Sequence, residues 1–119
     1  MEIEINKIND VSIAEIISDR IEITNTQDAL DIMANCNYQG SSKIILHEKN
    51  IIPDFFDLKT GLADDILQKF TNYNIKVAII GDFSKYKSKN FKDFLYESNK
   101  HGRINFVSSI EEAKVSLLK

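Results

Sequence analysis

The segment Lys76-Val77-Ala78-Ile79-Ile80-Gly81-Asp82-Phe83-Ser84 decides the fold of this chain. Four aliphatic residues follow Lys76 directly, without the polar alternation that marks a strand with one face in water. Such a run predicts a strand covered on both faces, as in a parallel sheet flanked by helices. Gly81 and the polar residues after it predict that the strand ends in a turn.

Further strands are predicted on both sides of this one. An aliphatic run recurs at residues 44–46, and residues 104–107 are predicted as the last strand. At the N-terminus, Ile3, Ile5 and Ile8 form a mostly alternating strand. The pair Asn9-Asp10 tolerates the positive φ angles of a tight turn, so residues 11–17 are expected to return as the second strand of a hairpin.

Four helices are predicted between and after these strands, each with a start signal and an apolar stripe. The start signals are a capping box of Thr24 and Gln27, an N-cap at Asp57, an N-cap at Ser88, and a capping box of Ser109 and Glu112. The expected stripes are Leu30, Met33 and Ala34; Leu62, Ile66, Phe70 and Tyr73; Phe91, Phe94, Leu95 and Ser98; and Ile110, Ala113, Leu117 and Leu118. Gly40 and the segment 99–102 are the expected stops of the first and third helices.

The resulting order is β-β-α-β-α-β-α-β-α, an α/β fold with a mixed, mostly parallel sheet. The 119 residues fit a single domain, and 43% hydrophobic with 28% charged residues is ordinary for a globular protein. A net charge of -3 argues against nucleic acid as the main partner. The local lysines Lys85, Lys87, Lys89 and Lys92 are diluted by acidic neighbours and are interpreted as a solvated face.

The sequence also indicates where the protein works. A single cysteine, Cys36, cannot form an internal disulfide, which fits a reducing compartment. The N-terminus lacks a positive region followed by an apolar run, and no apolar stretch approaches the length that spans a bilayer. We therefore expect a cytoplasmic protein without membrane contact.

Several stretches carry a family resemblance that covers nearly the whole chain. They are residues 54–58, 66–70, 76–84 and 88–99, of which Gly81-Asp82-Phe83-Ser84 with the following helix is the most specific. In these residues the chain resembles the bacterial family called domain of unknown function 4180. The resemblance implies an α/β fold and a cytoplasmic protein, and it implies no activity.

The order of elements also resembles the STAS domain, the fold of anti-sigma-factor antagonists. That family carries a phosphorylated serine in an Asp-Ser-Ser/Thr-Gly-Leu pattern after the central strand. Here the stretch is Asp57-Leu58-Lys59-Thr60-Gly61-Leu62, in which Lys59 takes the place of the serine. The resemblance therefore implies a regulatory interaction module in which Thr60 alone inherits the phosphorylation site.

Polar residues after two strands form the candidate binding site. Ligands of open α/β sheets bind beyond the carboxyl ends of the strands, where helix N-termini also favour anions. The candidate binding residues are Asp57, Thr60, Gly61, Asp82, Phe83, Ser84 and Ser88. The alternative interpretation is that Asp57 and Ser88 are N-caps and that Asp82-Phe83-Ser84 only shapes a turn.

The sequence gives little support for a metal site, a reactive cysteine or a phosphate-binding loop. His47 and Glu48 invite a metal or acid–base interpretation, but His101 lies on another element, and no metal site or cofactor is predicted. Cys36 is expected to be a buried structural thiol, and no glycine-rich phosphate loop is present. Most of the aromatic residues near these loops are expected in the core, and the alternative is that Phe55-Phe56 and Phe83 to Tyr86 leave a partly exposed apolar patch that serves as an interaction surface.

Three functions remain open. The first is a regulatory module that binds a protein partner, or a second copy of itself, through the loops around Thr60 and Ser84. The second is a binder of a small anionic ligand in the strand-end crevice. An enzyme that uses Asp82 or Asp57 as acid or base ranks last, because no nucleophile or cofactor motif accompanies them.

Overall fold

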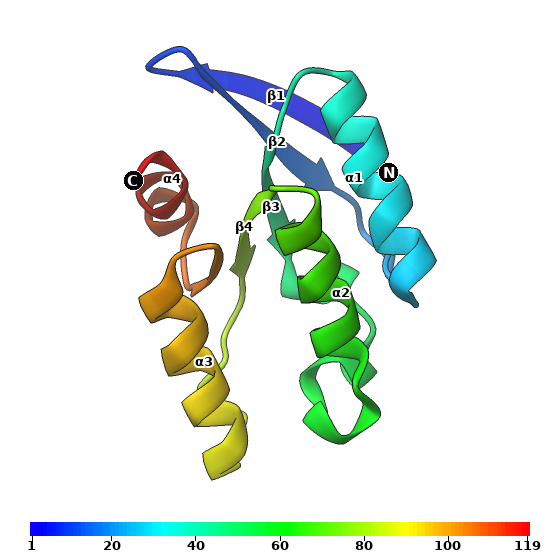
Figure 1. Cartoon of the computed structure of the whole chain (residues 1–119), viewed down its shortest axis with the longest axis vertical. Coiled ribbons are helices and arrows are strands. Elements are labelled where there is room, and N and C mark those ends of the chain that lie inside the picture. Colours follow the sequence, from blue (N-terminus) through cyan, green and yellow to red (C-terminus); the bar gives the residue numbers. More distant parts are fainter.

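A computed structural model describes residues 1–119 and contains the predicted elements in the predicted order. Figure 1 shows the helices arranged around the central strands. The strands are β1 (Glu2–Ile8), β2 (Val11–Ile17), β3 (Lys43–His47), β4 (Lys76–Ile80) and β5 (Ile104–Val107), and the helices are α1 (Thr26–Tyr38), α2 (Leu62–Asn72), α3 (Lys89–His101) and α4 (Ile110–Leu118). Three 3₁₀ turns lie between β3 and α2, at Glu48–Asn50, Pro53–Phe56 and Leu58–Thr60.

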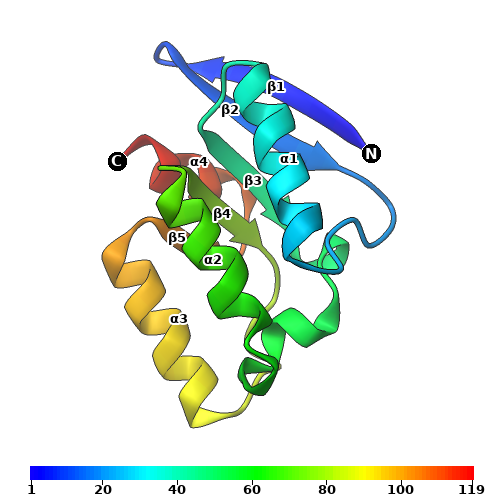
Figure 2. The same cartoon turned by 45° about the vertical axis from the view of Figure 1, so that its right-hand side comes forward.

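The five strands form one sheet in the order β1-β2-β3-β4-β5. β1 pairs antiparallel with β2, and the remaining neighbours are parallel. Each parallel connection steps to the next strand in the same direction, and such crossovers are right-handed, so their helices share one face. Figure 2 shows α1, α2 and α3 in front of the sheet and α4 behind it. The predicted mixed, mostly parallel α/β fold is confirmed.

The core has two parts because the sheet is covered on both faces. The larger part lies under α1, α2 and α3 and includes Ile44, Val77 and Phe106. The smaller part lies under α4, where Ala113 and Leu117 pack on the opposite side of the same strands. The central aliphatic runs are therefore buried on both faces, as their lack of alternation predicts.

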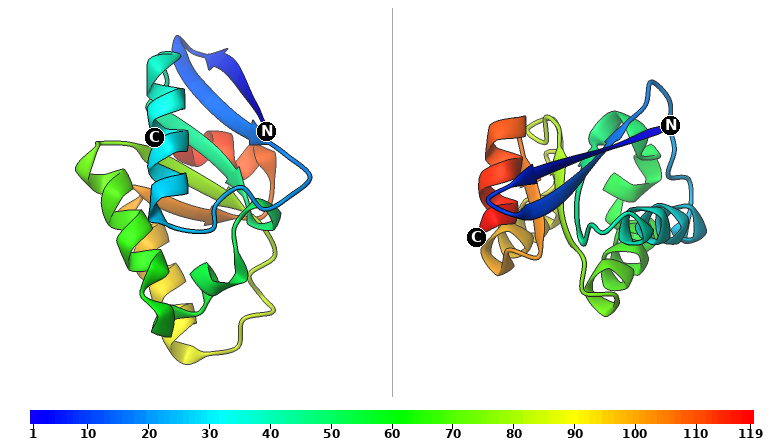
Figure 3. Two further views of the ribbon diagram at one scale, coloured as in Figure 1. Left: turned by 90° about the vertical axis from the view of Figure 1, so that its right-hand side faces the viewer. Right: turned by 90° about the horizontal axis from the view of Figure 1, so that it is seen from above.

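The two edges of the sheet differ. The predicted hairpin is present, with Asn9 and Asp10 at φ angles of 51° and 66°, and it places β1 at one edge (Figure 3). At the other edge, Asn99 of α3 pairs with the backbone of β5. Its Nδ2 donates to the Phe106 carbonyl at 3.2 Å, and the Phe106 N–H donates to its Oδ1 at 2.7 Å. The amide thereby satisfies backbone groups that an edge strand leaves unpaired.

The start of α1 differs from the prediction. The N-cap is Asn25, whose side chain accepts from the Asp28 N–H, so the capping box of Thr24 and Gln27 is wrong. Thr24 instead donates its hydroxyl and its N–H to the Asp28 carboxylate. The buried stripe also differs from the prediction. The buried residues are Ala29, Ile32, Met33 and Cys36, and of the expected stripe only Met33 is buried.

The start of α2 also differs from the prediction. Asp57 caps the 3₁₀ turn at Leu58–Thr60 and not the helix, which begins at Leu62 after Gly61 at a φ angle of 75°. Tyr73, expected in the buried stripe, is 64% exposed because the helix has ended at Asn72. The caps at Ser88 and Ser109 are confirmed. No helix is long and apolar enough to cross a membrane.

Candidate functional site

The loop after β4 holds its own polar side chains. The Asp82 carboxylate accepts from the Ser84 hydroxyl at 2.6 Å and from the Ser84 N–H at 3.1 Å. These bonds form a small turn and lower the pKa of Asp82. Both side chains are exposed and border a cavity of about 520 Å³ that Thr60 and Asp57 do not line.

Glu48 ties this loop to the segment after β3. One carboxylate oxygen accepts from the Asp82 N–H at 3.2 Å, and the other accepts from the Tyr86 hydroxyl at 2.7 Å. Lys85 places its ammonium 2.7 Å from the same second oxygen. Burial, together with the bond to Glu48, raises the pKa of Tyr86 well above its usual range. Glu48 therefore acts as a clamp between two loops, which its position beside His47 did not reveal.

The predicted phosphorylation segment is also held by local bonds. The Thr60 hydroxyl lies 2.8 Å from the Asp54 carbonyl and 2.9 Å from that of Asp57, and it accepts from the Leu62 N–H at 3.2 Å. Asp57 accepts from the Lys59 N–H at 3.2 Å. Thr60 is exposed, but its hydroxyl already bonds to the backbone on both sides of the turn.

The remaining predicted binding residues have structural partners. Ser88 accepts from the Phe91 N–H at 3.1 Å and caps α3. Phe83 packs edge-on against Phe106, with ring centroids 5.2 Å apart. Phe55 and Phe56 are buried, so the predicted core position of this pair is confirmed and the alternative of an exposed patch at this pair is wrong. The 3₁₀ turns fold the pair under the loop after β4.

The reactive side chains are placed apart from one another. His47 Nε2 lies 2.8 Å from the Glu15 carboxylate on the sheet. Cys36 is fully buried in α1, and this burial raises the pKa of its thiol to about 11. No group of three or more His, Cys, Asp or Glu side chains gathers in a way that could hold a metal ion.

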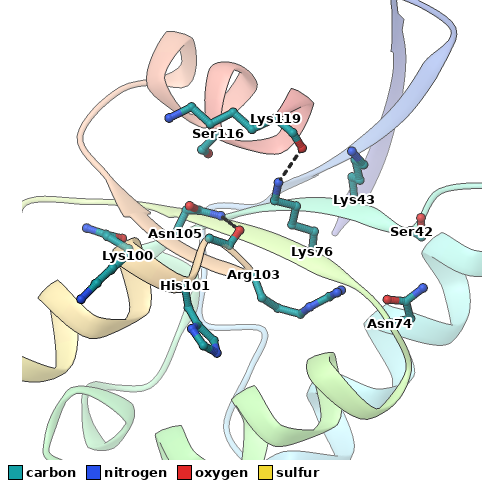
Figure 4. Close-up of a pocket in the computed structure, with 12 residues that line it drawn as sticks. Ser42, Lys43, Asn74, Lys76, Lys100, His101, Arg103, Asn105, Ser116 and Lys119 are labelled. Carbon is teal, nitrogen blue, oxygen red and sulfur yellow. Dashed lines mark hydrogen bonds between the residues drawn. The ribbon is translucent and has the colours of Figure 1, made fainter.

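A pocket at the opposite end of the sheet contains a cluster of basic residues. It lies at the amino ends of β3, β4 and β5, beside the C-terminal ends of α3 and α4 (Figure 4). Its volume is about 620 Å³, and none of its lining residues is hydrophobic or acidic. We call this cavity the basic pocket. Its basic lining residues are Lys43, Lys76, Lys100, His101, Arg103 and Lys119.

Parallel strand order brings these residues together. Lys43 is the first residue of β3, Lys76 is the first of β4, and Arg103 directly precedes β5. Because parallel strands begin at the same edge of a sheet, these three side chains meet there. The βαβ connections bring the C-terminal end of α3 to the same edge, which adds Lys100 and His101.

Only part of this positive charge has a partner in the protein. Lys43 donates to the Leu117 carbonyl at 2.5 Å, and Lys76 donates to the Lys119 carbonyl at 3.1 Å. These bonds satisfy the last turn of α4, whose carbonyls carry partial negative charge. Burial, and then the charges of Lys43, Arg103 and Lys119, lower the pKa of Lys76. Arg103 is half-buried, extends toward Asn74, and makes no side-chain hydrogen bond or ion pair (Figure 4).

Comparison with known proteins identifies the family. The model of a family described as "Domain of unknown function (DUF4180)" matches residues 8–117. The chain belongs to the DUF4180 family. No curated protein and no solved structure matches the chain. The resemblance of this DUF4180 domain to STAS domains therefore stays a prediction.

The basic pocket was not anticipated from the sequence of the DUF4180 domain. The prediction considered the carboxyl ends of the strands, where sheet ligands usually bind. A signal was nevertheless present, because a basic residue opens or precedes three successive parallel strands. The lysines Lys85, Lys87, Lys89 and Lys92 form a denser run in the sequence but lie outside this pocket.

Proposed function

We propose that this domain is a non-catalytic binding protein for a small anionic ligand, which it holds in the basic pocket. One observation carries the proposal. One pocket is lined by five cationic side chains and His101, and it has no acidic side chain. These residues come from the amino ends of three strands and from two helix ends. The protein as a whole has a net charge of -3, so the positive charge is local to the pocket. Concentrated positive charge in a concave site attracts and retains anions.

Arg103 is the residue that most directly calls for a ligand. A guanidinium group presents its donors in a fixed planar fork that matches the oxygens of phosphate and carboxylate groups. The Arg103 side-chain nitrogens make no bond within the protein and stay open to the pocket, and the neighbouring Lys76 is also positive. An anion between these two groups would satisfy the planar donor fork of the arginine and relieve the repulsion between them. The two lysine bonds to α4 leave further ammonium donors free, since each ammonium has three.

Titration calorimetry of the wild-type protein and charge-neutral variants tests this proposal. Orthophosphate and sulfate are the probes, at constant ionic strength. Arg103→Gln is the main variant, because the guanidinium makes no contact whose loss would unfold the protein. We expect it to weaken orthophosphate binding about tenfold or more, consistent with a charge-assisted bond. The control is Lys92→Gln, which removes one exposed charge from α3 outside the pocket.

The outcomes separate specific binding from general charge attraction. If Lys92→Gln weakens binding as much as Arg103→Gln does, the anion responds to net charge and the pocket is not its site. If neither anion binds the wild-type protein at millimolar concentration, the proposal fails. Thermal unfolding provides a second measure, because a ligand at 100 times its Kd stabilises the protein by about 2.7 kcal/mol.

A regulatory module with a protein partner or a second copy as its target is the second candidate. The observation in its favour is the position of Thr60, which is exposed and uses its hydroxyl to hold the turn before α2. A phosphate on Thr60 would break these bonds and add charge to an accessible loop. Mass spectrometry of protein purified from a bacterial cytoplasm, its expected location, tests for that phosphate. An unmodified Thr60 under all growth conditions would remove the basis for this candidate.

A further inference from the structure

The size and lining of the basic pocket describe its ligand further; this step rests on the proposed anion-binding function. The pocket volume of about 620 Å³ lies in the range of sites for small organic molecules. One tetrahedral oxyanion would leave most of that space empty. The pocket therefore has room for a body attached to the charged group of the ligand.

The charged side of the pocket suits a phosphate group. Arg103 offers a planar fork of donors, and Lys76 and Lys43 stand nearby on β4 and β3 (Figure 4). A phosphate monoester carries close to two negative charges at neutral pH and three acceptor oxygens. Several cations around one group match this charge better than they match a single carboxylate.

The neutral side of the pocket suits hydroxyl groups. Ser42 and Asn74 lie beside Lys43 and the Arg103 guanidinium, and neither side chain makes a hydrogen bond within the protein (Figure 4). Ser116 of α4 donates its hydroxyl to the Ala113 carbonyl and retains its acceptor lone pairs. Free donors and acceptors beside a cationic group can pair with the hydroxyl groups of a polyol attached to a phosphate.

The lining also provides no surface that would recognise a nucleobase. Binding sites for nucleobases provide an aromatic or apolar surface on which the flat base stacks. No residue that lines this pocket is hydrophobic. A base would therefore remain in water and add little to affinity.

We infer that the ligand of the basic pocket is a phosphate ester of a small polyhydroxylated compound, held by Arg103, Lys76 and Lys43 at the phosphate and by Ser42 and Asn74 at the hydroxyl groups. Four probes test this inference by titration calorimetry: orthophosphate, ribose, ribose 5-phosphate and adenosine monophosphate. Ribose 5-phosphate differs from orthophosphate by the polyol, from ribose by the phosphate and from adenosine monophosphate by the base, so these three parts are measured separately.

We expect ribose 5-phosphate to bind about five- to tenfold more tightly than orthophosphate, as one or two additional hydrogen bonds provide. Adenosine monophosphate should bind within about threefold of ribose 5-phosphate, and ribose alone should give no measurable heat. Asn74→Gly should reduce the advantage of ribose 5-phosphate and leave orthophosphate binding unchanged. Glycine suits this position because Asn74 has a φ angle of 57°. Asn72→Ala, at an exposed position outside the pocket, is the matched control.

Two results would overturn this inference while leaving the proposed function intact. The first is equal affinity for orthophosphate and ribose 5-phosphate, with both reduced by Arg103→Gln, which would describe a bare anion site. The second is adenosine monophosphate binding more than tenfold tighter than ribose 5-phosphate, which would show recognition of the base. If no phosphate compound binds, or if Arg103→Gln has no effect on any of them, the proposed function and this inference fail together.

Discussion

Glu48 lies directly against the backbone of Gly81. A Cβ atom at position 81 would stand 2.6 Å from Glu48 Oε1 and 2.7 Å from Glu48 Cβ. The first contact could be relieved by rotation of the Glu48 side chain, but the second cannot, because Cβ moves only with the backbone. Gly81 therefore allows β4 to pass into its loop while Glu48 holds the Asp82 N–H and the Tyr86 hydroxyl.

Gly81→Ala should therefore destabilise the protein although alanine is a small residue. We expect a loss of about 1–3 kcal/mol in the free energy of unfolding, as is typical when a well-packed site is overfilled. Urea denaturation followed by circular dichroism measures this loss. Lys87→Ala, in the same loop and exposed, is the control and should change stability by less than about 0.5 kcal/mol. Equal stability of Gly81→Ala and the wild type would show that the segment after β3 moves freely.

Thr60 offers a second test of a single side chain. Its hydroxyl bonds to the carbonyls of Asp54 and Asp57 and to the Leu62 N–H, so it joins the 3₁₀ turns to the start of α2. Thr60→Ala should cost about 1–2 kcal/mol of unfolding free energy, the usual cost of a lost cap. Thr60→Ser keeps the hydroxyl and should recover most of that stability. A serine variant as unstable as the alanine variant would assign the effect to the lost methyl group.

The main features of the fold follow from local sequence patterns. The aliphatic run at residues 77–80 predicts a strand buried on both faces, and α4 and the other helices cover it on opposite sides. The turn Asn9-Asp10 and the caps at Ser88 and Ser109 depend on residues close in sequence, so they were predicted at the correct positions. The start of α1 was misplaced because Thr24, Asn25 and Thr26 can all act as N-caps, and the choice among them depends on Asp28.

The features that were not predicted depend on contacts between distant residues. Glu48 meets the loop at Gly81–Asp82 only because β3 and β4 are neighbours in the sheet. The basic pocket combines Lys43, Lys76 and Arg103, which are far apart in the chain and meet only at the amino edge of the parallel strands. The predicted binding residues at the carboxyl edge are found where expected, but their polar atoms are engaged in local turns and caps.

The pKa of Asp28 predicts how stability changes in acid. Hydrogen bonds from the Thr24 hydroxyl and then from the Thr24 N–H lower the pKa of Asp28 below its ordinary value of 3.8. A carboxylate with a lowered pKa in the folded state stabilises the protein above its unfolded pKa, and this contribution is lost as the pH falls through the folded pKa. Asp28→Asn should therefore be less stable than the wild type at pH 7, by about 1 kcal/mol for the charge-assisted bonds.

Unfolding experiments between pH 7 and pH 2.5 check this prediction. The difference between the wild type and Asp28→Asn should be constant above about pH 5 and should shrink below pH 3.8 as Asp28 becomes protonated. Asp54→Asn serves as the control, since the exposed Asp54 side chain makes no hydrogen bond or ion pair. A difference that stays constant down to pH 2.5 would contradict a role for the ionised carboxylate.

The contacts of Lys43 and Lys76 connect the basic pocket to α4. Both ammonium groups bond to carbonyls at the end of this helix, and Lys119 brings a third positive charge to the same place. Repulsion among these charges opposes the packing of the last turn, and a bound anion would neutralise it. Because coupling between two events is reciprocal, an anion that stabilises this turn must also bind more tightly when the turn is in place.

Hydrogen exchange should therefore be slower in α4 when phosphate is bound. We expect the backbone amides of Leu117 and Leu118 to exchange at least about threefold more slowly with saturating phosphate, because they report local opening of the helix end. Amides of the β1–β2 hairpin, which lies outside the pocket, are the internal control and should change less. Arg103→Gln should abolish the difference. Equal slowing in the hairpin and in α4 would indicate only global stabilisation, and faster exchange in α4 would mean that the anion takes Lys43 and Lys76 away from the helix.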